Sequence, residues 1–201
     1  MAVKLGILGG TFDPIHYGHL IAAQEVLWAL GLEQVLFVPA GVPPHKPGAI
    51  VSPAHHRVAM VELAVRGNPS FVVSRVDVDR PGPAYSVDMV RLLREERGPE
   101  AEFYFIVGLD SLNDILTWHD PQRLISLAML AVVMRPGYPM PDLARLERSV
   151  PGISQRVCFV PMPEIGISSS DLRHRVAIDQ PIRYQLPEAV EAYIYRQGLY
   201  R

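Results

Sequence analysis

Two histidines near the N-terminus have the spacing of a phosphate-binding pair. His16 and His19 follow a short apolar run, with Gly18 between them. At the start of a helix this spacing puts the imidazoles about one turn apart, where they can point to the same face. Gly18 would leave room for an oxygen-rich group, to which imidazole N–H groups can donate hydrogen bonds. The preceding Gly9-Gly10 pair would let the backbone approach a ligand closely, so we expect a phosphate site here.

Two other interpretations of the histidine pair stay open at this level. One makes them ordinary polar residues at a helix start. The other makes them metal ligands, although a closed metal site needs further ligands. The nearest candidates, His45, His55 and His56, form no recognisable motif, so we expect no protein-bound metal site. The chain also lacks both the dinucleotide fingerprint G-x-G-x-x-G after its first strand and the P-loop G-x-x-x-x-G-K-[ST].

A second polar cluster lies near the C-terminus. Ser168, Ser169 and Ser170 precede a predicted helix, and Arg173 follows one turn into it. Hydroxyls and backbone N–H groups at a helix start can bind phosphate, and an arginine supplies a fork for its oxygens. Taken alone, three serines at this position are more often a plain helix cap.

The elements that would position these residues alternate along the chain. Short apolar runs predict strands over Val3–Leu8, Val35–Val38, Phe71–Val76, Phe103–Val107, Leu130–Met134 and Val157–Val160. Helical signals cover Gly18–Leu30, the segment opening at Ser52-Pro53, Ser86–Gly98, Ser169–Ala177 and Pro187–Gln197. Most runs are apolar on both faces, as in a parallel sheet covered by helices on both sides. We therefore expect an α/β fold: a single doubly wound, Rossmann-like domain over residues 1–201, with a mostly parallel sheet and its site at the carboxyl ends of the strands.

Composition limits the choice of partners. The 201 residues carry a formal net charge of −2, without the basic surplus of a protein that binds polynucleotides, so we expect small-molecule substrates and no nucleic acid. No run approaches the roughly 20 apolar residues that span a bilayer, and the N-terminal apolar run is short for a secretory signal. We expect no membrane partner and a cytoplasmic location. The sequence leaves the oligomeric state undetermined, so a homo-oligomer stays open.

The two polar clusters together resemble a known signature. The segment Gly9-Gly10-Thr11-Phe12-Asp13-Pro14-x-His16-x-Gly18-His19 is similar to the first motif of the H-x-G-H nucleotidyltransferases, and Ile167–Arg173 is similar to their I-S-[ST]-[ST]-x-x-R motif. Four further segments resemble the bacterial nicotinate-nucleotide adenylyltransferase branch: Pro43–Lys46, Arg80–Ser86, Gly108–Ser111 with Trp118, and Tyr193–Arg201. Ser86 stands where that branch more often has threonine.

The resemblance implies transfer of the adenylyl group of ATP to nicotinate mononucleotide, giving nicotinate adenine dinucleotide and pyrophosphate in NAD biosynthesis. It implies direct in-line attack, with Mg²⁺ on the phosphate oxygens and with His16, His19 and Arg173 as the catalytic residues. The residues implied to bind ATP are Gly9, Gly10, Thr11, Phe12, His16, His19, Gly108, Asp110, Ser168, Ser169, Ser170 and Arg173. Those implied to bind nicotinate mononucleotide are Lys46, Tyr85, Ser86 and Trp118.

Physical roles can be given to the residues of the second group. Trp118 offers an aromatic face to the cationic ring, Ser86 at a helix start offers donors to the ring carboxylate, and Lys46 a point charge to a phosphate. Without the resemblance, Trp118 and Tyr85 would be read as packing residues and Lys46 as a solvated charge. The alternatives are a pantetheine-phosphate adenylyltransferase and a nucleotide-binding regulator without turnover; an oxidoreductase is disfavoured by the missing fingerprint.

Overall fold

The computed structural model describes residues 2–43, 51–134 and 140–201. Six strands form one parallel sheet in the order β3-β2-β1-β4-β5-β6. Their bounds are β1 Lys4–Gly10, β2 Gln34–Pro39, β3 Phe71–Val73, β4 Glu102–Gly108, β5 Met129–Met134 and β6 Val157–Pro161. The order reverses between β1 and β4, the switch point beside which open α/β sheets bind ligands. The predicted doubly wound α/β fold is confirmed.

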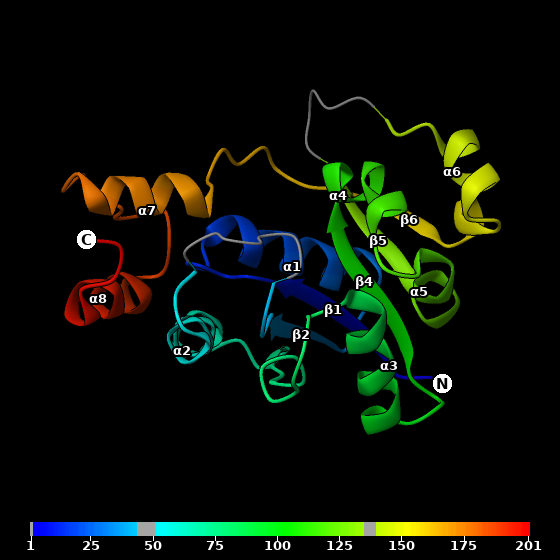
Figure 1. Ribbon diagram of the computed structural model, residues 1–201, viewed down its shortest axis with the longest axis horizontal. Coiled ribbons are helices and arrows are strands. Elements are labelled where there is room, and N and C mark those ends of the chain that lie inside the picture. Colours follow the sequence, from blue (N-terminus) through cyan, green and yellow to red (C-terminus); the bar gives the residue numbers. More distant parts are fainter. Residues whose placement is uncertain (1, 44–50, 135–139) are drawn as a thin grey trace.

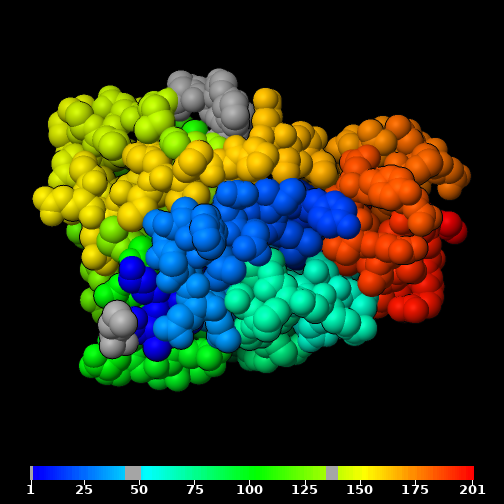
Figure 2. All heavy atoms as spheres, turned by 180° about the vertical axis from the view of Figure 1, so that it is seen from behind, coloured from blue at the N-terminus to red at the C-terminus, as the bar shows by residue number. Residues whose placement is uncertain are grey.

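Helices cover both faces of the sheet (Figure 1). They are α1 Tyr17–Ala29, α2 Ala54–Val65, α3 Ser86–Arg97, α4 Leu109–Asn113, α5 Pro121–Leu127, α6 Leu143–Ser149, α7 Ser169–Ala177 and α8 Glu188–Gln197, with 3₁₀ turns η1 Ile115–Thr117 and η2 Ile153–Gln155. All five predicted helices are present: α7 has the predicted bounds, and the predicted bounds of the others are met within two residues. Helices α4, α5 and α6 were not predicted. Seen from behind, α1 lies between α2 and the segment that follows β6 (Figure 2).

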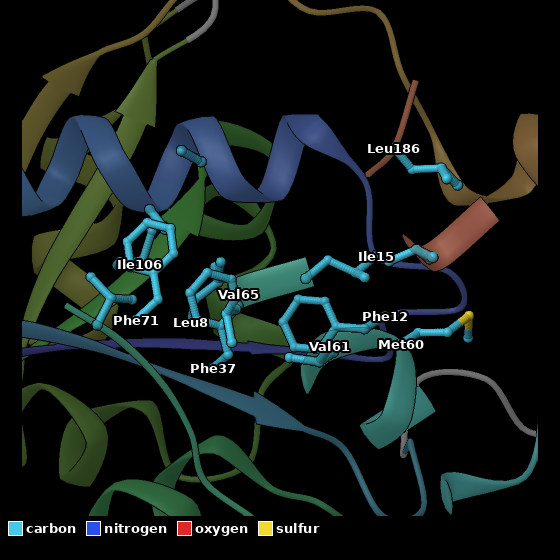
Figure 3. Close-up of a cluster of buried hydrophobic side chains, with 14 of the residues drawn as sticks. Leu8, Phe12, Ile15, Phe37, Met60, Val61, Val65, Phe71, Ile106 and Leu186 are labelled. Atoms are coloured by element: carbon cyan, nitrogen blue, oxygen red, sulfur yellow. The ribbon is translucent and has the colours of Figure 1, made fainter. Parts of the chain in front are cut away.

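Two apolar clusters lie on opposite faces of the sheet. One joins α1, α2, α7 and α8 to the sheet through residues such as Phe12, Phe37 and Ile106, several of which are drawn in Figure 3. The other joins α3, α4, α5 and α6 through residues such as Leu93 and Leu130. Because the strands contribute alternate side chains to each cluster, both faces of the sheet are buried.

Two strands end more than one residue away from the predicted position. β1 runs two residues beyond Leu8, so Gly9 and Gly10 belong to the strand, where they pair with β2. β3 ends at Val73, three residues before the predicted end. The amides of Val78 and Asp79 bond back to the carbonyl of Arg75, both at 2.9 Å, and this turn ends the strand.

Candidate active site

A cavity of about 470 Å³ opens at the carboxyl ends of β1, β4 and β5. It lies at the switch point of the sheet, where the fold class predicts a ligand site. The predicted site residues that line it are Gly9, Gly10, Thr11, His16, His19, Tyr85, Ser86, Gly108, Asp110, Trp118, Ser168 and Ser169. Segments far apart in the sequence therefore meet around one space, which a nucleotide-sized ligand would fill.

The two histidines lie at the start of α1, as the spacing predicts. His16 is the N-cap and His19 the third residue of the helix, and their ring centroids are 3.9 Å apart. The backbone N–H of His16 donates to Nδ1 of His19 at 3.3 Å. With Nδ1 as an acceptor, the neutral His19 ring carries its proton on Nε2, the nitrogen suited to donate to an anionic ligand.

Gly18 makes room for a neighbouring side chain. A Cβ at this position would meet Cε1 and Nδ1 of the His16 ring at 3.0 Å. The glycine therefore accommodates the buried imidazole of His16, and it also borders the cavity. A side chain here would displace the first histidine of the pair.

Phe12 lies beneath the histidines and not in the cavity. Its ring is buried in the core near Val61 and Met60 (Figure 3) and meets the His19 ring edge to face, with centroids 5.1 Å apart. A φ of 51° turns the chain at this residue and sends its side chain inward. Its contact with His19 supports that imidazole from below.

The serine cluster at the start of α7 braces the loop that leads to the histidines. Ser168 caps the helix by accepting from the N–H of Asp171 at 3.1 Å, and the hydroxyl of Ser169 donates to the carbonyl of Pro14 at 2.9 Å. Nη1 of Arg173 donates to the carbonyl of Asp13 at 2.7 Å, and Nη2 to Ser170 Oγ at 3.4 Å. Ser168 and Ser169 border the cavity, whereas Ser170 and Arg173 are not among its lining residues.

The start of α3 and the turn after η1 form the other side of the cavity. Tyr85 is the N-cap of α3, and its ring stacks on His119 with centroids 4.4 Å apart and an interplanar angle of 27°. Trp118 is half-buried and meets Phe105 edge to face at 6.0 Å. The N-terminus of α3 thus opens next to two aromatic surfaces, an arrangement that suits an anionic group attached to a flat ring.

An ion pair between a half-buried arginine and a buried carboxylate holds this segment in place. The carboxylate of Asp77 accepts from Nε of Arg80 at 2.7 Å, and Arg80 Nη2 donates to the carbonyl of Tyr85 at 3.5 Å. Burial raises the pKa of Asp77 and the Arg80 guanidinium opposes that rise. Arg80 therefore links a buried carboxylate to the residue that caps α3.

Two of the residues that border this side of the cavity, Asp77 and His119, were not predicted as site residues. Adjacency to Trp118 was the signal for His119, and the i,i+3 spacing to Arg80 the signal for Asp77. The site of Lys46 lies outside the described residues.

Among the described residues, no group of three or more His, Cys, Asp or Glu side chains has the geometry of a metal site. Nor is any helix in the described ranges both long and apolar enough to cross a bilayer.

Comparison with known proteins identifies the family. Residues 7–175 match the cytidylyltransferase-like family. The chain is 54% identical over 198 residues to the "Probable nicotinate-nucleotide adenylyltransferase" of Thermomicrobium roseum, a match that covers 98% of this chain and 92% of the relative. It is 46% identical over 202 residues to the protein of the same name from Moorella thermoacetica, again covering 98% of this chain and 92% of the relative.

The fold has a solved counterpart as well. The structure described as Plasmodium falciparum nicotinic acid mononucleotide adenylyltransferase complexed with NaAD matches with a TM-score of 0.79 at 20% identity, covering 98% of this chain and 97% of that one. Because the sequence identity is low, this match shows only that the two proteins share a fold. The family assignment rests on the curated relatives. The chain belongs to the nicotinate-nucleotide adenylyltransferase family of cytidylyltransferase-like proteins.

Proposed function

We propose that this enzyme joins ATP to nicotinate mononucleotide in the cavity at the carboxyl ends of β1, β4 and β5, releasing pyrophosphate and nicotinate adenine dinucleotide in NAD biosynthesis. The observation that carries the proposal is the pairing of two unlike surfaces around one space. His16 and His19 with the start of α7 form one, and the start of α3 with Trp118 forms the other. Two substrates must meet in such a reaction, and each surface suits one of them.

The first surface binds ATP. Backbone groups of Gly9, Gly10 and Thr11 and the positive end of the α1 dipole receive the phosphates, with His16 and His19 as side-chain donors. Ser168 and Ser169 contribute hydrogen-bond donors from the start of α7. The ribose lies against Gly108 and Asp110, which follow the buried part of β4. Phe12, Ser170 and Arg173 act from behind, because their contacts are with His19 and with the loop that carries the histidines.

The second surface binds nicotinate mononucleotide. The ring carboxylate meets the N-terminus of α3 at Tyr85 and Ser86, where the helix dipole and backbone N–H groups favour a negative charge. Trp118 lies against the cationic ring. Serine in place of threonine at position 86 keeps the backbone donors. Lys46 remains proposed as a phosphate partner on sequence grounds.

The chemistry is a direct in-line displacement. An oxygen of the mononucleotide 5′-phosphate forms a bond to the α-phosphorus of ATP, while the bond from that phosphorus to the bridging oxygen of pyrophosphate breaks. The attacking phosphate is already ionised at neutral pH, so no general base is needed, and the protein positions the reactants and stabilises charge. His19 Nε2 and the His16 ring hold oxygens whose charge changes during transfer.

Mg²⁺ is proposed to enter with ATP. The described residues offer no cluster of three or more metal-ligating side chains, which fits an ion held mainly by the triphosphate oxygens and water. When bound it would neutralise part of the phosphate charge. His16, His19 and the N-terminus of α1 orient the same phosphate oxygens.

A pyrophosphate-release assay tests the function. Release should require ATP and nicotinate mononucleotide together, and neither alone should support it. Replacing the mononucleotide with pantetheine phosphate should give background rates; turnover with it would assign the chain to the other adenylyltransferase branch. Binding of ATP without release under any of these conditions would make the protein a nucleotide-binding regulator instead.

A further inference from the structure

The loop between β1 and α1 is fixed by a buried polar network whose central residues, Arg57, Asp13 and Tyr200, are not among those that line the cavity. Its centre is Arg57 of α2, which is 2% exposed. Its guanidinium donates to three carbonyls: Nε to Ser52 at 2.9 Å, Nη1 to Thr11 at 2.9 Å and Nη2 to Gly41 at 3.0 Å. Arg57 therefore joins the loop after β1 to the loop after β2.

Asp13 carries the second half of the network. It is 3% exposed, and its Oδ2 accepts from the backbone N–H of Ser52 at 3.0 Å. Its Oδ1 accepts from the hydroxyl of Tyr200 at 2.6 Å, a contact between residues 187 positions apart. Burial lowers the pKa of Arg57 while the nearby charge of Asp13 opposes that shift, so the two charges stabilise each other. Burial and the bond to Asp13 raise the pKa of the Tyr200 hydroxyl, which keeps it a donor.

The same short loop is held from a third direction. Arg173 donates to the carbonyl of Asp13 and Ser169 to the carbonyl of Pro14, both from α7. Two residues further along the chain, His16 begins α1. Three residues between the strand and the histidines, Thr11, Asp13 and Pro14, are therefore held by contacts from α2, α7 or the C-terminal segment.

We propose that Tyr200 and Arg57 are positioning residues for adenylyl transfer, which act through Asp13 and Thr11 to fix His16 and His19 against the phosphates. The inference rests on the proposed function. Burying a charged network costs free energy that apolar packing of the same volume would avoid. Directional bonds to carbonyls and carboxylate oxygens supply what apolar packing lacks, a fixed position for the loop to within a fraction of an ångström.

The test uses Tyr200→Phe in the full chain, which removes one hydroxyl and keeps the ring. We expect kcat to fall about tenfold or more, while the KM values for ATP and nicotinate mononucleotide stay within about twofold, because the contacts of bound substrate are kept and only the alignment for transfer is lost. The matched control is Tyr193→Phe. It removes the hydrogen bond between the Tyr193 hydroxyl of α8 and Nδ1 of His56 of α2, which are 2.9 Å apart. This bond holds the same C-terminal region against α2 but does not involve the loop. Its kcat should match that of the wild type.

A double-mutant comparison separates an effect on catalysis from an effect on folding. In an Asp13→Asn background, Tyr200→Phe should lower kcat less than about threefold further, because Tyr200 acts through the Asp13 carboxylate. Equal effects of Tyr200→Phe in both backgrounds would overturn the inference. So would a wild-type kcat for Tyr200→Phe, or equal losses in Tyr200→Phe and Tyr193→Phe that follow a lowered melting temperature. A wild type without turnover would overturn the proposed function itself, which distinguishes the two failures.

Discussion

At the scale of single residues, the proposed chemistry depends on the protonation and placement of two imidazoles. The bond from the His16 backbone to Nδ1 of His19 directs the proton of the neutral ring to Nε2. Phe12 supports that ring from the core, and Gly18 gives the His16 ring its space. The H-x-G-H spacing is therefore explained by mutual packing as much as by ligand contact.

His19→Ala should lower kcat by ~10² or more, because a donor to the charge-bearing oxygens is lost from a preorganised site. The melting temperature should change little, since a truncated imidazole at the cavity edge leaves the core intact. His174→Ala is the matched control, because His174 lies exposed on α7 and does not border the cavity. Steady-state kinetics would exclude His19 from the mechanism if its variant kept a near-wild-type kcat. We expect a similar, smaller loss for His16→Ala.

Trp118→Ala should separate the two substrates. Stacking on a cationic ring contributes ~0.5 to 2 kcal/mol, so nicotinate-mononucleotide binding should weaken roughly 2-fold to 30-fold. ATP affinity should stay within about twofold, because no adenylate contact is proposed for this residue. Equilibrium binding of each ligand, with a melting curve, measures both effects.

Trp28→Ala provides the control for that experiment, since Trp28 is 83% exposed on α1. Neither affinity should respond to it. Trp118 also touches Phe105 edge to face, so a modest loss of stability is expected from its truncation. A collapse of the melting temperature, or equal loss of both ligands, would make Trp118 a packing residue only.

At the scale of elements, the proposed carboxylate site depends on how firmly the start of α3 is held. The pair of half-buried Arg80 and buried Asp77 does this through the carbonyl of Tyr85. Arg80→Gln should lower the free energy of unfolding by about 3 kcal/mol at neutral pH, because it leaves a buried carboxylate without its cation. Arg91→Gln is the matched control. It breaks the exposed ion pair between Arg91 and Glu95 of α3 and should lower the free energy of unfolding by about 1 kcal/mol or less.

The deficit of Arg80→Gln should shrink as the pH falls. Burial already raises the pKa of Asp77, and removing the guanidinium that opposes this rise raises it further. Between the unfolded and the raised folded pKa the folded state binds more protons, so stability falls as pH rises through this window. Denaturant unfolding at pH 7.5 and pH 5 measures the difference. A deficit that stays the same or grows at pH 5 would contradict the role given to the pair.

The elements also show what the sequence could and could not predict. The six strands and the five longer helices were predicted from apolar runs and caps, because burial on both faces leaves a clear pattern. Helices α5 and α6 span seven residues each, which is too short for a helical repeat of apolar residues to be recognised. Their N-caps, Asp120 before Pro121 and Asp142, were the only signals for them. The contact of Arg173 with Asp13, across 160 positions, could not be predicted, because it depends on how α7 packs against the loop.

At the scale of the whole molecule, we propose that residues 1–201 fold as one domain. Both apolar clusters use the same six strands, so neither can form without the sheet. A Trp28→Phe variant would leave Trp118 as the only tryptophan, reporting on the face covered by α3. Its fluorescence and the far-UV circular dichroism should melt at the same temperature. Two separate transitions would contradict the single domain.

The whole molecule also brings together what the proposed reaction needs. The histidines follow the first strand, Trp118 lies mid-chain, the serines begin α7, and Tyr200 ends the chain, yet all of them meet the cavity or the loop beside it. In the proposed arrangement, this cavity receives a ring carboxylate at the start of α3 while ATP occupies the histidine side. A mononucleotide with an amide in place of the carboxylate would lose the negative charge that the α3 N-terminus favours.

The most direct test compares kcat/KM for nicotinate mononucleotide and nicotinamide mononucleotide at saturating ATP, with pyrophosphate release as the readout. We expect a ratio above one in favour of the nicotinate form, because only its carboxylate gains from the helix dipole and the backbone N–H groups at Tyr85 and Ser86. A ratio at or below one would contradict the carboxylate site at α3.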